Sequence, residues 1–318
     1  MNIPRYAAEL AGRLASMIEP VPDTAAVVQL AQPSTDDVRR RLDTVVAAVA
    51  GLSPLRQDEL KVRLEQSRTV LRGSNGARAV GLHASGALIV KLGVAPFDEI
   101  FERDPGDGEL TIMVTDAAER LGLPKLVPDD ERLEFEKLWR IKAAGSGQDG
   151  RRCEPVLCRA VGAYRHHVRG LPVLGRASAT VELTGKGAPA SVTVSLRRFA
   201  GESGGSGGEV ITEAAVRKPD AAAAEVAARL VKAFGEVDEL RGTELIPESF
   251  RFGYFSLGRR REQSLLAPFY VASVAVQGQE EHSAHVIVVP GTEEQYVRLP
   301  TGQRSASSAR MSLALQPA

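Results

Sequence analysis

The chain has 318 residues with 40 basic and 40 acidic side chains, so its formal net charge at pH 7 is zero. A dedicated nucleic-acid-binding protein carries a basic excess, so this balance argues against that class. We also find no apolar run near the ~18 residues of a membrane span and no secretory signal. The sequence therefore slightly favours a cytoplasmic protein, unless an export segment has been removed. It does not predict the oligomeric state.

The two cysteines, Cys153 and Cys158, lie five positions apart. On an extended segment such a separation places two side chains on opposite faces, so we expect no disulfide between them. A chain of this length can bury about three quarters of its unfolded surface and needs no disulfide or metal to stabilise its core. The length also predicts two domains, or one large one.

The first part of the chain is predicted to be rich in helices. Apolar residues at helical spacing indicate an amphipathic helix over residues 1–18. Ser34, followed by two aspartates, has the pattern of a helix start, and the spacing predicts a helix over 36–50. Pro54 suits the first position of another helix, which we place over 54–71.

The next segment mixes the two kinds of element. Two apolar runs around a Ser-Gly turn predict a hairpin over 77–92. A strand is expected over 109–114 and a helix over 130–142. The Gly-Ser-Gly-Gln-Asp-Gly segment at 145–150 has the composition of a domain boundary.

The second half of the chain has the alternation of half-buried strands. Runs at 161–169, 173–183 and 191–199 place successive side chains on opposite faces. An alanine-rich helix is predicted over 220–234, and further antiparallel strands over 269–299. The predicted class is therefore α+β, with a helix-rich region and small hairpin over 1–144. An antiparallel sheet with packed helices follows over 151–318.

This second region resembles a known pair of modules. The segment YRHHVRGLPVLGRASATVEL, Tyr164–Leu183, is similar to the core of the FTP propeptide module of fungalysin- and thermolysin-type peptidases. There a polar strand ends in a Gly-(Val/Ile)-Pro-Val step, which here reads Gly-Leu-Pro-Val at Gly170–Val173. The helix at 220–234 and the strand at Leu266–Val276 look like parts of the PepSY module that often follows. The closing turn, Val289–Thr292, departs from the usual Asp-Ala-x-Thr-Gly.

The resemblance implies a binding role and no peptidase. FTP and PepSY modules act as inhibitory propeptides and folding assistants of a peptidase, and no His-Glu-x-x-His motif accompanies them here. What the resemblance implies is a free-standing module that binds a protein partner in trans, without a cofactor.

Other candidate sites match their templates poorly. The Gly-x-Ser-x-Gly pattern around Ser203 lies in a Gly/Ser tract with no helix behind it, so we interpret it as a loop. Two histidine pairs, His166 with His167 and His282 with His285, have the wrong spacing to share a strand face, and no metal site is predicted. The Asp-Pro-Gly-Asp-Gly segment at 104–108 lacks the closing glutamate of a calcium loop and is interpreted as a turn.

Basic side chains offer the remaining signals. Arg165, His167 and Arg169 share one face of a predicted strand, and we predict that this stripe is exposed and contacts an acidic partner. The alternative interpretation is that the stripe is a solvated sheet face with no partner. The run Arg259–Arg261 is interpreted as a solvated loop face rather than an anion site.

Two functions remain open from the sequence. The first is a non-catalytic binding module, an inhibitor- or chaperone-like partner of another protein, with no catalytic residue. The alternative is an enzyme or small-molecule-binding protein with a pocket between the helical half and the sheet.

Overall fold

The computed structural model describes residues 3–53, 55–73, 75–95, 97–145, 153–200, 208–235, 244–277 and 282–299. The chain divides into two compact units. Unit 1 comprises Met1–Val27, Val210–Phe255 and Ala267–Ala318, and unit 2 comprises Val28–Glu209 and Ser256–Leu266. Each unit combines α-helices with antiparallel strands, so the predicted α+β class is confirmed.

Unit 2 is built on one antiparallel sheet. Within this unit the strand order is β2-β3-β4-β5-β10-β9-β7, and both β6 and β8 pair with β7. The strands are β2 (Lys61–Glu65), β3 (Arg68–Arg72), β4 (Arg78–Leu82), β5 (Leu88–Lys91), β6 (Arg132–Ala143), β7 (Val156–Val168), β8 (Leu171–Leu174), β9 (Ala179–Leu183) and β10 (Pro189–Val194). The end of β1 (Thr24–Gln29) pairs with β13 (Leu265–Leu266) beside it.

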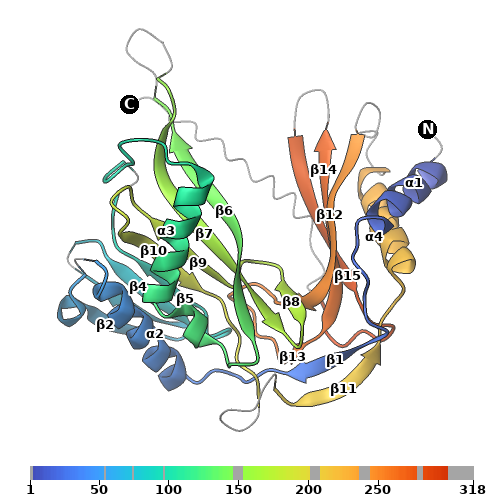
Figure 1. The fold of residues 1–318 in the computed structure, drawn as a ribbon. Helices are drawn as coiled ribbons and strands as arrows, with labels where there is room; N and C mark the ends of the chain where they lie inside the picture. Colours follow the sequence, from blue (N-terminus) through green and yellow to red (C-terminus); the bar gives the residue numbers. More distant parts are fainter. Residues whose placement is uncertain are drawn as a thin grey trace. The chain divides into compact units, whose positions relative to one another are not determined.

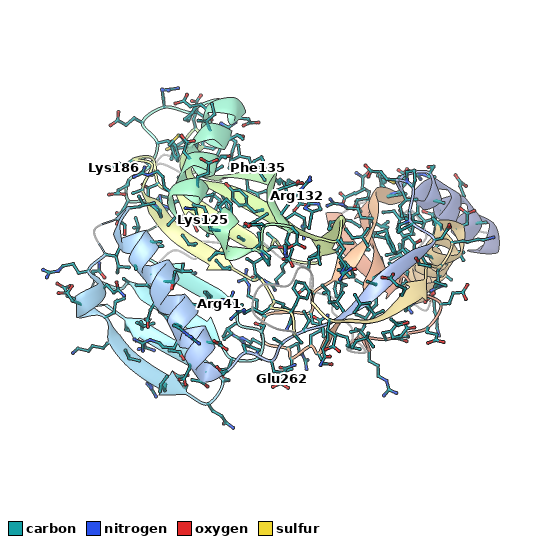
Figure 2. The ribbon with its side chains drawn as sticks, turned by 60° about the horizontal axis from the view of Figure 1, so that its bottom comes forward. Arg41, Lys125, Arg132, Phe135, Lys186 and Glu262 are labelled. Atoms are coloured by element: carbon teal, nitrogen blue, oxygen red, sulfur yellow. The ribbon has the colours of Figure 1, made fainter. Side chains whose placement is uncertain are left out.

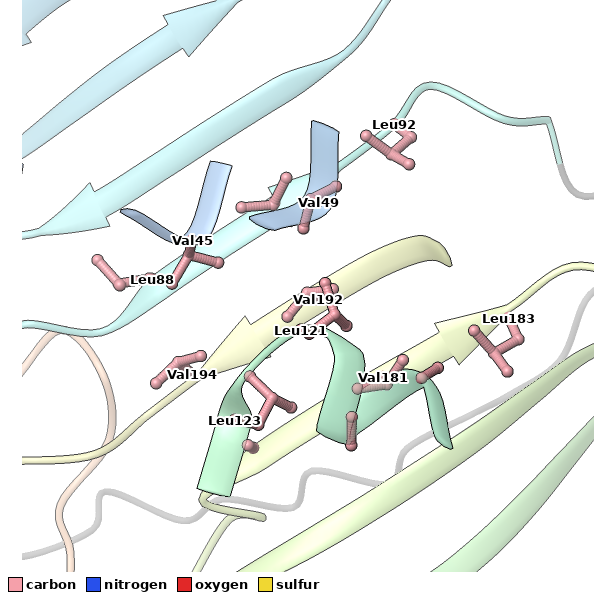
Figure 3. Close-up of a cluster of buried hydrophobic side chains, with 14 of the residues drawn as sticks. Val45, Val49, Leu88, Leu92, Leu121, Leu123, Val181, Leu183, Val192 and Val194 are labelled. Atoms are coloured by element: carbon pink, nitrogen blue, oxygen red, sulfur yellow. The ribbon is translucent and has the colours of Figure 1, made fainter. Parts of the chain in front are cut away.

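Two helices, α2 (Thr35–Ala50) and α3 (Asp107–Arg120), cover one face of this sheet (Figure 1). Two short 3₁₀ segments lie at Gln57–Glu59 and Leu123–Leu126. The core lies between helices and sheet: Val45 and Val49 of α2 pack towards β5, and Leu121 after α3 packs towards β9 and β10 (Figure 3). The two helices therefore cover this face of the sheet in unit 2, and the opposite face is not covered by them.

Unit 1 has the same two kinds of layer. Strands β12 (Glu244–Phe255), β14 (Pro268–Gln277) and β15 (His282–Pro290) form antiparallel pairs with β14 in the middle. Helices α1 (Ile3–Ala15) and α4 (Pro219–Gly235) pack on each other and on these strands, and β11 (Val210–Ala215) precedes α4. Tyr270 stacks on Phe250 with ring centroids 5.3 Å apart, and burial raises its phenol pKa to about 12.

Several predicted elements are confirmed. Helix α2 begins after Ser34, whose side chain accepts a hydrogen bond from the Asp37 backbone N–H as an N-cap should. Helix α4 matches the prediction at 220–234, and β4 with β5 forms the predicted hairpin. The alternating runs after residue 161 fall in strands β7 to β10, but the run predicted at 173–183 is divided between β8 and β9, and the run at 191–199 is a strand only as far as Val194.

The helix predicted over 54–71 is wrong. The segment instead forms a 3₁₀ turn and the β2–β3 hairpin, in which Glu65 pairs with Arg68 across a two-residue turn. The sequence KVRLE of β2 alternates polar and apolar residues, which is strand periodicity. Pro54 itself lies outside the described residues, and the period-2 pattern that follows it outweighs one helix-start signal.

The helix predicted over 130–142 is also wrong, because this segment is β6. The register of β6 against β7 shifts between Phe135 and Lys137, which marks a β-bulge. A bulge reverses the alternation, so Phe135 and Leu138 lie on one face of the strand although they are three residues apart, a spacing that imitates a helix. The strand predicted over 109–114 is wrong in the opposite sense, because Leu110, Val114 and Ala117 are buried on one face of α3.

The two units do not follow the boundary predicted at 145–150. Strands β6 and β7 lie on either side of it and pair with each other from Arg132 to Ala143. Both therefore belong to unit 2, and the glycine-rich segment connects two arms of one hairpin. Most of residues 145–150 lie outside the described part of the chain.

Candidate anion-binding groove

The sheet face of unit 2 opposite the helices carries a groove with a volume of about 650 Å³. Seven cationic side chains line it, and no acidic residue is among the described lining residues. The cations are Arg68, Arg78, Lys91, Arg176, Arg259, Arg260 and Arg261. In a chain with no net charge, this concentration of positive charge is a candidate site for anions.

Strand alternation places the groove residues. On β4, Arg78, Val80 and Leu82 face the groove, whereas Ala79 is buried in the core under α2. On β5, Lys91 likewise faces the groove. The groove therefore has an apolar floor between charged walls.

The segment Ser256–Leu266 supplies three of the arginines, and side chains of the sheet hold it in place. Ser85 Oγ donates a hydrogen bond to the Arg259 carbonyl at 2.5 Å, and Arg259 Nε donates to Ser195 Oγ at 2.8 Å. Arg197 Nη2 donates to the Arg261 carbonyl at 2.9 Å. These bonds fix the backbone of the segment, so the arginines are displayed from an ordered support.

Most of the groove cations have no opposite charge beside them among the residues that the structure describes. Arg68 is an exception, because its Nε lies 2.5 Å from Glu65 Oε2. Burial lowers the pKa of Arg259, and the neighbouring Arg176 guanidinium lowers it further. A bound anion would relieve this repulsion, so the groove is electrostatically complementary to a negatively charged ligand.

The predicted stripe of Arg165, His167 and Arg169 is only partly exposed. Arg165 is 8% exposed; its Nη2 lies 2.6 Å from Glu136 Oε2, and its Nη1 donates to the Val173 carbonyl at 2.7 Å. The prediction that this arginine is exposed is therefore wrong. Arg169 is exposed, with a positive φ of 49°. Arg165 joins β6, β7 and β8 and has a structural role.

On the other face of β7, His166 forms a buried pair that the sequence did not indicate. Its Nε2 lies 2.5 Å from Oε2 of Glu131, and the two side chains are 4% and 1% exposed. Glu131 comes from the turn before β6, so only the β6–β7 pairing brings the two groups together.

His167 gives a test of stability against pH. Burial lowers its pKa below the ordinary value of 6.5, although the Glu134 carboxylate 3.6 Å away acts in the opposite direction. The unfolded chain therefore takes up a proton near pH 6.5 while folded His167 does not, and stability falls as the pH falls below that value. We expect the loss of melting temperature between about pH 7.5 and about pH 5.5 to be smaller in His167→Gln than in the parent. An unchanged loss would contradict this role.

The remaining sequence candidates are placed as follows. In the Asp-Pro-Gly-Asp-Gly segment, Asp104 pairs with Arg140 and Lys142. No cluster of three potential metal ligands occurs in the described part of the chain. Both cysteines are free. Ser203 and the side chain of His282 lie outside the described residues.

Comparison with known proteins gives a fold and no function. No family model and no curated protein matches the chain. A crystal structure of an uncharacterized protein from Eubacterium rectale is similar, with a TM-score of 0.53 and 9% sequence identity, over 87% of this chain and 86% of that one. At this identity the likeness shows the fold alone. Among the described helices, none is long and apolar enough to cross a membrane.

Proposed function

We propose that this chain is a non-catalytic binding module for a protein partner, and that an acidic segment of the partner binds in the groove of unit 2. The observation that supports this proposal is the lining itself: seven cations converge with no acidic residue among the described lining residues. Arginine dominates the set, and its planar guanidinium suits bidentate contact with carboxylates.

The resemblance to FTP and PepSY modules supports the same class of function. Such modules bind a protein through strands and sheet faces, and the groove lies on an uncovered sheet face. We therefore propose an inhibitor- or chaperone-like role in trans, with the contact made by the groove rather than by Arg165.

Binding of a fluorescent oligo-glutamate peptide tests the proposal. The groove variant Arg78→Glu, Lys91→Glu, Arg260→Glu is expected to weaken binding at least about tenfold at low salt, since charge reversal at a contact costs attraction and adds repulsion. Parent binding should also weaken as salt rises.

The matched control is Lys125→Glu, Arg132→Glu, Lys186→Glu, which changes net charge by the same amount. These three residues of unit 2 are exposed. They lie away from Glu262, which marks the segment Ser256–Leu266 beside the groove (Figure 2). Their replacement should leave affinity within about twofold of the parent. Equal losses in both variants, or tight binding by the groove variant, would place the contact elsewhere.

A further inference from the structure

A small chamber lies at the inner end of the groove, between the sheet and the segment Ser256–Leu266. Its volume is about 20 Å³, which is enough for one occupant of about the size of a water molecule. It shares Arg176 and Arg259 with the groove. Its other polar lining residues are Arg197 and four serines, Ser85, Ser178, Ser195 and Ser256.

Among the described residues that line this chamber, every charged side chain is positive. Three guanidinium groups line it, and none of the three forms an ion pair within the described part of the chain. Arg197 and Arg259 are partly buried, and burial lowers the pKa of each. Placing cations together away from water is unfavourable unless a negative charge accompanies them.

Two of the four hydroxyl groups add neutral donors to the same space, whereas the Ser85 hydroxyl already donates to the Arg259 carbonyl. Ser195 Oγ accepts from Arg259 Nε at 2.8 Å, and Ser178 Oγ accepts from the His166 backbone N–H at 3.0 Å. Each hydroxyl therefore uses an acceptor position in these contacts, and its proton can still be donated into the chamber. Arg259 Nε is the nitrogen that bonds Ser195, which leaves the two Nη groups to donate elsewhere.

We infer that this chamber binds a single monatomic anion, chloride under ordinary conditions. The volume excludes a carboxylate or phosphate group and admits one small ion, and the lining supplies donors and positive charge. The ion offsets one of the three positive charges and bridges the residues around Ser195 to the segment Ser256–Leu266. This inference does not rest on the proposed function, because it concerns an occupant separate from the partner.

Bromide tests the site directly. Crystals of the full chain grown in or soaked with sodium bromide are expected to show one anomalous peak in the chamber, beside Arg259 and Ser195. In solution, chloride should raise the melting temperature by about 2 °C over gluconate at equal sodium concentration, because gluconate is too large to enter.

Two variants and a control complete the experiment. The readout is the melting temperature in chloride minus that in gluconate, because a general loss of stability lowers both values and leaves their difference unchanged. Arg259→Met should abolish the difference, and Ser195→Ala should reduce it. Arg260→Met is the matched control and should keep it, because Arg260 lines the groove and not the chamber. A chamber without anomalous signal, holding water only, would overturn the inference, as would an equal difference in Arg259→Met and the parent.

Discussion

Arg165→Ala is expected to lower the free energy of unfolding by about 3 to 5 kcal/mol. The guanidinium is buried, its Nη2 lies 2.6 Å from Glu136, and its Nη1 donates to the carbonyls of Val173 and Arg176. The substitution leaves the Glu136 carboxylate without this partner and two carbonyl groups without a donor.

Urea denaturation of the variant measures this loss. Arg169→Ala is the control, since Arg169 is exposed four residues further along, and its replacement should change stability by less than about 0.5 kcal/mol. Similar small effects for both arginines would mean that Arg165 is solvated, and the stripe would regain its place as a candidate contact surface.

The second large effect is expected at the buried pair of Glu131 and His166. Glu131→Ala removes the only acceptor in contact with His166 Nε2 among the described residues and leaves a cavity, so we expect a loss of about 3 kcal/mol or more. Glu131 Oε1 is itself buried without a hydrogen-bond partner in the described part of the chain, so the intact pair is costly to bury.

A double variant that removes both polar groups tests this explanation of the loss. The double variant Glu131→Leu, His166→Leu is expected to be more stable than Glu131→Ala, because it replaces both polar groups with apolar ones. The measurement is again the free energy of unfolding in urea. If the double variant is no more stable than Glu131→Ala, the stranded histidine and the cavity do not account for the loss.

Capping residues and apolar spacing predicted the elements whose structure depends on their own segment of the sequence. In α2 the cap at Ser34 and the spacing of Val38, Leu42 and Val45 indicate the same structure, and the helix forms as predicted. In β6 the bulge at Glu136 disturbs the alternation, and a bulge depends on the partner strand β7 rather than on the segment itself. The pattern alone therefore favoured a helix.

The groove could be predicted only in part. Arg259–Arg261 are conspicuous in the sequence, but the solvated-loop interpretation missed that the sheet anchors this segment. The other groove cations come from separate strands, and their convergence is a property of the tertiary structure. The prediction that Arg165 is exposed was wrong for the same reason. Arg165 lies on the predicted face of the strand, but β8 and Glu136 bury it.

The anchoring of Ser256–Leu266 also determines when the groove can exist. The bond from Ser85 to Arg259 joins residues 174 positions apart, so a long loop must close before the groove is complete. During synthesis the sheet of unit 2 emerges from the ribosome well before this segment. A nascent or truncated chain that ends before residue 256 can form the sheet but not the complete groove. Under the proposed function, binding of an acidic ligand in the groove therefore requires that translation of the chain has passed this segment.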